Sequence, residues 1–202
     1  MIVTSCKHCE NQAIYKCSLC GNILCADHAK LRTVCQSCIE KPTLEYSVEK
    51  VSSKEQRIKI REFAESFWGE QEQLAFDGKF LVRTLPAYSA IVQGNFAGFI
   101  SFADVSDAII IVALGILPKY QDAGIGRSLV ERVETEAKRL GKRRVLVSTS
   151  NDDLPALAFY QSIGFQIFEV KTDVIAEKHG QVLKGIGGLP IRDELRLRRI
   201  LC

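Results

Sequence analysis

Between residues 125 and 140 the hydrophobic side chains recur every three or four positions, the spacing that places them on one face of an α-helix. The recurring residues are Leu129, Val130, Val133, Ala137 and Leu140. Gly141 follows them directly and is a typical C-terminal stop. Two shorter segments predict helices over residues 54–67, after a pair of serines that suit an N-cap, and over residues 154–163, before a glycine.

Other hydrophobic segments are short and either continuous or alternating, as β-strands are. They cover residues 44–51, 88–93, 96–102, 108–114, 145–148 and 165–170. Gly94-Asn95 is a two-residue hairpin signal between the second and third of them. The tail, residues 194–200, is compatible with a strand or a helix. The order strand, helix, several strands, then helix, strand, helix and strand predicts a mixed α/β sheet with flanking helices.

The first forty residues have a different composition. Seven of the eight cysteines lie between Cys6 and Cys38, and the eighth is the last residue. Clustered cysteines in a chain without a secretion signal indicate metal binding rather than disulfides. Pro42 interrupts regular structure after this region. We therefore expect a zinc-binding module over residues 1–40 and a separate domain over residues 45–202.

The cysteines occur in pairs separated by two residues, and one histidine completes the set. The predicted ligands are Cys6, Cys9, Cys17, Cys20, Cys25, His28, Cys35 and Cys38. A tight turn within each pair brings two side chains to one tetrahedral ion, so eight ligands predict two structural Zn²⁺ sites. So small a segment has too little core to fold without such help. Iron–sulfur ligation is the less favoured alternative, and His8 is expected at the surface.

The order of these pairs resembles cross-braced fingers of the B-box and RING kind. That resemblance implies that the first and third pairs share one ion and that the second and fourth pairs share the other. Sequential pairing is the alternative.

A glycine-containing segment, Gln121-Asp-Ala-Gly-Ile-Gly126, joins the strand of residues 108–114 to the long helix. Its glycines allow a tight turn that exposes successive N–H groups at a helix N-terminus, where an anion binds. Arg127 adds a positive charge beside them. An ordinary strand-to-helix turn is the alternative, because the glycine patterns of dinucleotide sites and P-loops are both missing.

With its preceding strand and Pro118-Lys-Tyr120 approach, this segment resembles the acetyl-CoA loop of the GNAT N-acetyltransferase superfamily. A second stretch, from Asn151 to Phe165, resembles the second signature of that family: an Asn, a helix carrying Phe-Tyr, and a final Gly-Phe. The resemblance extends over about residues 45 to 200. It implies a GNAT-type sheet with a V-shaped splay that opens a cleft for the pantetheine arm.

The resemblance also implies roles for individual residues. The expected cofactor-binding residues are Leu114, Gly115, Ile116, Gln121, Asp122, Ala123, Gly124, Ile125, Gly126, Arg127 and Asn151. The first three would pair with the pantetheine arm, the loop would hold the pyrophosphate, and Asn151 would lie near the pantetheine. Tyr160 would protonate the CoA sulfur. For the general base, Glu62, Glu65, Asp104 and Asp107 are available, and their spacing singles out none of them.

We therefore expect an N-acetyltransferase that transfers acetyl from acetyl-CoA to an amine of a protein or small molecule. Its zinc module would add stability or dock a protein partner. The alternatives are a non-catalytic module that senses acetyl-CoA and a zinc-dependent binder of protein or nucleic acid. The net charge of +3 is too small to indicate nucleic acid or membrane. With no apolar signal core or membrane-length segment, a cytoplasmic location is expected.

Overall fold

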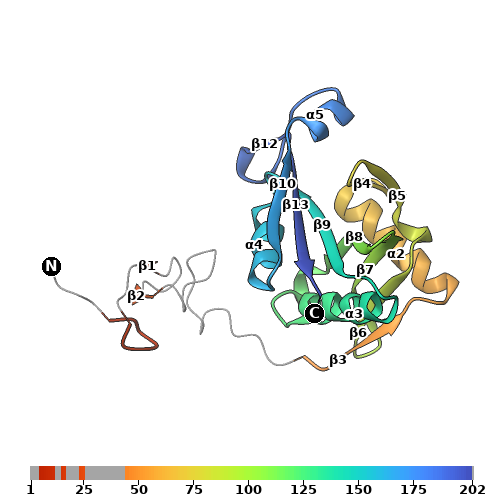
Figure 1. Ribbon diagram of the computed structural model, residues 1–202. Helices are drawn as coiled ribbons and strands as arrows, with labels where there is room; N and C mark the ends of the chain where they lie inside the picture. The colour runs from red at the N-terminus through yellow and green to blue at the C-terminus, as the bar shows by residue number, and fades with distance from the viewer. Residues whose placement is uncertain (1–4, 12–14, 17–22, 26–43, 202) are drawn as a thin grey trace. The chain divides into compact units, whose positions relative to one another are not determined.

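The computed structural model describes residues 5–11, 15–16, 23–25 and 44–201 (Figure 1). The chain divides into two units, Met1–Thr43 and Leu44–Cys202. In the first unit, the short strands β1 (Tyr15–Lys16) and β2 (Ile23–Leu24) pair in antiparallel fashion. The expected zinc ligands that lie outside the described residues are Cys17, Cys20, His28, Cys35 and Cys38.

The second unit is built on a seven-stranded sheet with the order β10-β13-β9-β8-β7-β6-β3. Its strands are β3 (Tyr46–Lys50), β6 (Ala87–Val92), β7 (Asn95–Val105), β8 (Ala108–Ile116), β9 (Arg144–Ser150), β10 (Gln166–Lys171) and β13 (Glu194–Ile200). Neighbouring strands are antiparallel except β8 and β9, which run parallel. The expected mixed α/β sheet is thus confirmed.

Helices cover both faces of this sheet (Figure 1). The helices α3 (Ile125–Arg139) and α4 (Leu154–Ser162) share one hydrophobic core with the sheet, whereas α2 (Lys54–Trp68) packs into a second core. Four of the five residues on the predicted apolar face of α3 are buried, and Leu129 and Val133 are fully enclosed. The fifth, Leu140, is the C-cap of the helix and is exposed. Both cores are dominated by branched aliphatic and aromatic side chains, whose removal from water is the main stabilising contribution.

The ends of α2 follow the sequence closely. Of the two candidate serines, Ser53 is the N-cap: its side chain accepts a hydrogen bond from the amide of Gln56, whose own side chain accepts one from the Ser53 amide. The helix ends at Gly69, which has a left-handed φ of 72° and donates its N–H to the Glu65 carbonyl. Local sequence alone therefore specifies both ends of this helix.

The hairpin between β6 and β7 is shifted by one residue from the prediction. Val92 pairs with Asn95, so the two turn residues are Gln93 and Gly94, not Gly94 and Asn95. Both have positive φ, 48° and 75°, as a tight turn between twisted strands requires.

Several short elements have no counterpart in the sequence prediction. They are β4 (Glu72–Ala75), β5 (Gly78–Leu81), α5 (Val174–His179), β11 (Leu183–Lys184), β12 (Pro190–Ile191) and the 3₁₀ turns Val82–Thr84, Pro118–Tyr120 and Ile186–Gly188. The undecided tail is strand β13, which lies between β9 and β10. In the described part of the chain, every helix is too short or too polar to cross a membrane.

Candidate active site

The parallel pairing of β8 with β9 is short. It joins Ala108 to Arg144 at one end and Ile111 to Val147 at the other, and within the described residues it goes no further. Next to Ile111, the β7–β8 ladder has a bulge that leaves Val112 as the extra residue. A bulge bends its strand and increases the local twist. The rest of β8, up to Ile116, keeps β7 as a partner, while its other edge pairs with no strand among the described residues.

A cavity of about 720 Å³ occupies the region where the two strands stop pairing. Its floor is formed by residues 111–114 of β8 and residues 147–150 of β9. On one side it is lined by Asp153, Ala156 and Tyr160. On the other side it is lined by the end of α2, by β4, and by the segment between β10 and β13. Elements that the sequence did not predict, namely β4 and the segment between β10 and β13, thus form part of the cavity lining.

The glycine loop leads from the end of β8 to the start of α3. Gly124 is the N-cap of α3, with a φ of 81°, and supplies no side-chain cap. The first bond of the helix runs from the Ser128 amide to the Gly124 carbonyl. Asp122 also has a positive φ, 64°, so the chain turns twice in the left-handed region before the helix begins. Such a turn directs backbone N–H groups toward one point and suits an anion.

Two contacts fix this loop to the rest of the domain. The side-chain amide of Gln121 donates to the Ile116 carbonyl at 3.1 Å, which ties the loop to the end of β8. At the first turn of α3, the Ser128 hydroxyl lies 2.8 Å from the hydroxyl of Tyr46 on β3. The loop residues themselves do not contribute to the lining of the described cavity.

Tyr160 is buried in the cavity wall, with only 5% of its surface exposed. The rings of Phe159 and Phe165 meet it edge to face, at centroid distances of 5.1 and 5.4 Å. Burial raises the pKa of Tyr160, and the negative charge of Asp153 raises it further. The phenol therefore keeps its proton at neutral pH and is able to give it to a stronger base.

The carboxylates of the cavity wall differ from those considered in the sequence. None of Glu62, Glu65, Asp104 and Asp107 lines the cavity. Asp104 and Asp107 are at the opposite end of the β7–β8 hairpin, where they pair with Lys142 and Arg144. Glu65 accepts a hydrogen bond from Gln71.

The carboxylates that line the cavity are Asp152, Asp153, Glu70 and Glu194. Asp153 caps α4 by accepting the Ala156 amide, and the pKa of Asp153 is raised by burial and then by the charge of Asp152. Sequence analysis missed both aspartates, although they directly follow Asn151 in the second signature. The signal was present in the triplet Asn-Asp-Asp before a helix, where acidic and amide side chains serve as caps and backbone acceptors.

Asn151 lies beside the cavity but not in its lining. Its side-chain nitrogen donates to the Pro190 carbonyl at 2.7 Å, and its side-chain oxygen accepts the amides of Arg192 and Asp193 at 2.9 and 2.8 Å. The expected contact of Asn151 with the cofactor remains a prediction. Of the other predicted site residues, the cavity brings Leu114 and Tyr160 together.

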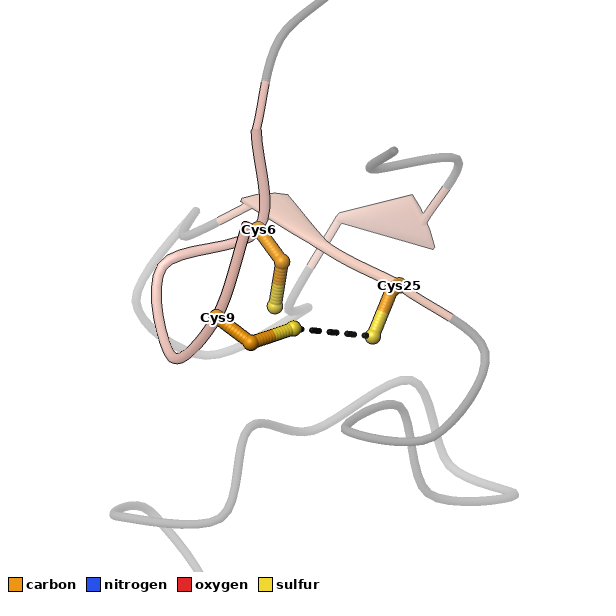
Figure 2. Close-up of side chains that lie close together, drawn as sticks. All are labelled: Cys6, Cys9 and Cys25. Atoms are coloured by element: carbon orange, nitrogen blue, oxygen red, sulfur yellow. Dashed lines mark hydrogen bonds between the residues drawn. The ribbon is translucent and has the colours of Figure 1, made fainter. Parts of the chain in front are cut away.

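In the first unit, three of the expected zinc ligands lie together (Figure 2). The Sγ atoms of Cys6, Cys9 and Cys25 are within 4.8 Å of one another, and those of Cys9 and Cys25 are 3.7 Å apart. Burial disfavours the Cys6 thiolate, but backbone N–H groups, first that of His8, outweigh it and lower the pKa of Cys6 to about 6. Three convergent cysteine side chains are a ligand set that suits a structural Zn²⁺ ion.

Comparison with known proteins agrees with the geometry of the second unit. Residues 51–165 match the family model described as the acetyltransferase (GNAT) family. The uncharacterized protein YdhI of Bacillus subtilis is 29% identical over 149 residues, which are 70% of this chain and 91% of that protein. The ribosomal protein bS18-alanine N-acetyltransferase of Escherichia coli is 26% identical over 99 residues, 49% of this chain and 67% of the enzyme.

Solved structures share the fold at lower identity. The IAA acetyltransferase of Bacillus cereus aligns with a TM-score of 0.60 at 20% identity, covering 78% of this chain and all of that protein (100%). A GNAT family acetyltransferase from Elizabethkingia anophelis, with acetyl-CoA bound, aligns with a TM-score of 0.60 at 16% identity, covering 80% of this chain and 100% of its own.

Proposed function

Because the chain belongs to the acetyltransferase (GNAT) family and is an acetyl-CoA-dependent N-acetyltransferase, we propose that its cavity at the end of the β8–β9 ladder is where acetyl passes to an amine. One observation carries this proposal: Tyr160 and the unpaired edge of β8 at Leu114 line the same cavity. The backbone edge proposed to hold the thioester thus lines the same cavity as a buried phenol.

The donor is proposed to bind along β8 and the glycine loop. Backbone groups of Leu114, Gly115 and Ile116 would pair with the pantetheine arm, in place of the missing strand. The pyrophosphate would lie on the loop from Gln121 to Arg127, where the uncapped start of α3 supplies N–H groups and the helix dipole. Fixing the donor in this way lowers the entropic barrier to transfer without a covalent enzyme intermediate.

The proposed reaction uses Tyr160 as a proton donor. The nitrogen of a neutral amine forms a bond to the thioester carbonyl carbon, and the carbon–sulfur bond then breaks. Tyr160 gives its phenolic proton to the departing CoA sulfur, and the proton lost by the nitrogen restores the phenol through solvent. Burial raises the pKa of Tyr160, so the phenol is protonated at neutral pH but is a weaker acid. Its proton would move only as negative charge builds up on the sulfur inside the same cavity.

The acceptor is proposed to enter from the side of α2, β4 and α5. Apolar side chains on that side include Trp68, Leu74 and Ile175, and its polar groups include Glu70, Gln73 and Lys178. This mixture suits a primary amine attached to an apolar body, on a protein or on a small molecule. A protein amine has a precedent in the relative that acetylates an alanine of ribosomal protein bS18.

For the first unit we propose two structural zinc ions. The cluster of Cys6, Cys9 and Cys25 supports the cross-braced arrangement with His28 as the fourth ligand, because sequential pairing would not bring Cys25 to the first pair. The ion would supply folding stability to a module with little core, and the folded module would dock a protein partner. A cytoplasmic location belongs to the same proposal, because cysteines stay reduced, and so able to bind zinc, under reducing conditions.

The test of the transferase proposal is release of CoA from acetyl-CoA in the presence of a panel of amines. The panel holds alkylamines, free amino acids and peptides with a free α-amine, and mass spectrometry identifies the acetylated product. We expect product with at least one amine class. Binding of acetyl-CoA without acetylation of any amine would contradict the proposal.

A further inference from the structure

The segment from Asp173 to Asp193, here called the acceptor wall, connects β10 to β13 and contains α5 and the β11–β12 hairpin. It supplies six of the residues that line the cavity. These are Ile175, Lys178, His179, Gly185, Ile186 and Ile191. Only two residue pairs join β11 to β12, and α5 is a short helix. Elements this small are not stable by themselves, so other contacts must fix the wall over the cavity.

Those contacts come from two consecutive residues at the end of β9. Asn151 uses both its side-chain amide groups on the wall, donating to Pro190 and accepting from Arg192 and Asp193. Its own backbone N–H donates to the Asp193 carbonyl at 3.0 Å. The C-terminal end of the wall is therefore bound to both the nitrogen and the oxygen of the Asn151 side chain.

Asp152 holds the hairpin. Its side chain is 4% exposed, with Oδ2 accepting the Ile186 amide at 3.0 Å and Oδ1 accepting the Ser150 hydroxyl at 2.5 Å. Gly185 approaches this carboxylate so closely that a Cβ atom at that position would overlap Oδ2. The contact thus depends on glycine at one position and an acceptor at the other.

The helix of the wall is attached to the same anchor. The Arg192 carbonyl accepts the amides of Ile175 and Ala176, and the Asp193 carboxylate accepts the amide of Asp173. Because Asn151 fixes the amides of these same two residues, the position of α5 follows from Asn151. A separate ion pair, Lys178 with Glu70 at 3.1 Å, joins α5 to the residues after α2.

We infer that Asn151 and Asp152 are positioning residues for the acceptor side of the active site: they hold the wall over the cavity and so determine affinity for the amine. The inference rests on the proposed transfer of acetyl to an amine in this cavity. It assigns Asn151 a part that differs from the cofactor contact implied by family resemblance. Within the described residues, the hydrogen bonds of the Asn151 side chain go to the wall and not to β8 or the glycine loop.

The experiment compares Asp152→Ala with Asp152→Asn. Alanine removes the acceptor for the Ile186 amide. Asparagine keeps it, because its oxygen accepts that amide while its nitrogen donates to the Ser150 hydroxyl. Asn151→Ala is the second variant, and Asn95→Ala, at the start of β7, is the control for loss of an amide side chain. Each variant is measured for amide hydrogen exchange, acetyl-CoA Kd, and the KM of phenethylamine as the acceptor.

We expect Asp152→Ala to speed exchange at Ile186, and Asn151→Ala to speed it at Arg192 and Asp193, each by about tenfold or more. The KM of phenethylamine should rise about tenfold in both variants while the acetyl-CoA Kd changes less than about twofold. Asp152→Asn should restore the exchange rates and the KM.

Three results would overturn the inference. Unchanged exchange in the alanine variants would show that the wall is held by other contacts. A rise in acetyl-CoA Kd that matches the rise in KM would return Asn151 to the cofactor site. Failure of Asp152→Asn to rescue would mean that the negative charge matters, not the hydrogen bond. Absence of turnover with phenethylamine in the unaltered protein counts against the proposed acceptor class alone, since exchange and acetyl-CoA binding do not depend on it.

Discussion

A Cβ atom placed on Gly126 would lie 3.3 Å from the Cζ atom of Phe159. The first turn of α3 therefore packs directly against α4, and the two sequence signatures meet in space. Phe159 is the neighbour of Tyr160, so the proposed pyrophosphate loop and the proposed proton donor are linked by one aromatic side chain. A substitution in the loop is expected to act on both functions through this contact.

Gly126→Leu should weaken acetyl-CoA binding by at least about tenfold, or about 1.4 kcal/mol. The leucine side chain would press on Phe159 and occupy space beside the exposed N–H groups of the helix start. Isothermal titration with acetyl-CoA measures the effect. Gly141→Ala, at the other end of α3, is the control: its φ of 69° makes the change costly for stability, but nothing near it contacts the loop. Equal affinities for both variants would contradict the prediction.

Tyr160→Phe should lower the rate of acetyl transfer by about 100-fold or more, since it removes the proton donor for the CoA sulfur. Acetyl-CoA Kd should stay nearly constant, because the aromatic packing is kept. Single-turnover measurements isolate the chemical step. Tyr88→Phe, at a buried tyrosine outside the cavity, controls for loss of a phenol. An unchanged rate of the chemical step in Tyr160→Phe would show that Tyr160 is not the proton donor.

Asp153→Asn should change how stability depends on pH. Burial, and then the charge of Asp152, raise the pKa of Asp153 above its ordinary 3.8 in the folded protein. The folded state binds this proton more tightly than the unfolded chain. Ionisation of Asp153 therefore lowers the free energy of unfolding as the pH rises above 3.8. Asparagine caps a helix as well as aspartate and carries no charge.

Urea unfolding at pH 3.5 and pH 7 tests this expectation. The variant should gain stability relative to the unaltered protein at the higher pH, and the difference should shrink at the lower one. If Asp153→Asn instead lost stability relative to the unaltered protein as the pH rose, the folded state would favour the ionised form of Asp153, against this prediction.

Cys25→Ser should reduce the zinc content from about two ions per chain to about one, if Cys25 shares an ion with Cys6 and Cys9. Cys6→Ser should give the same content, and so should the double variant, because both residues serve the same ion. Elemental analysis of the purified protein measures it. Cys202→Ser, outside the cysteine-rich region, is the control. A zinc content that falls further in the double variant than in either single one would favour separate ions.

The parts of the fold that sequence predicted best are those whose signal is local. Residues 125–140 were predicted as a helix, and α3 covers Ile125–Arg139, because five apolar positions on one face leave little choice of period. The Ser53 cap and the stop at Gly69 depend on residues within one turn. Their chemistry can be evaluated without knowing what they pack against.

The tail could not be decided in the same way. Leu197 is fully buried in β13, but Arg196 beside it is buried as well, on the other face of the strand. Its charge is compensated by Glu194, Asp77 and Glu169, which come from β13, the β4–β5 turn and β10. A buried arginine is acceptable only with such partners. Two of the three are distant in sequence, so local alternation gave no decision.

The cavity acids were missed for a related reason. Among the carboxylates considered, Asp104 and Asp107 flank the start of β8, whereas the cavity lies beyond Ile111 on the same strand. Which end of a strand faces a ligand depends on where its neighbour stops pairing. That point is set by the bulge at Val112, for which the sequence has no clear mark.

The strand order has a consequence in time as well as in space. Among the described strands, β10 pairs with the sheet through β13, which is synthesised later. Likewise, β9 has β8 as its one neighbour until β13 has been synthesised. During synthesis, β3 to β8 can therefore assemble first, while α4 and β10 wait for residues 194–200. The half of the domain that carries Tyr160 and the acceptor wall should be the last to become resistant to proteases on a growing chain.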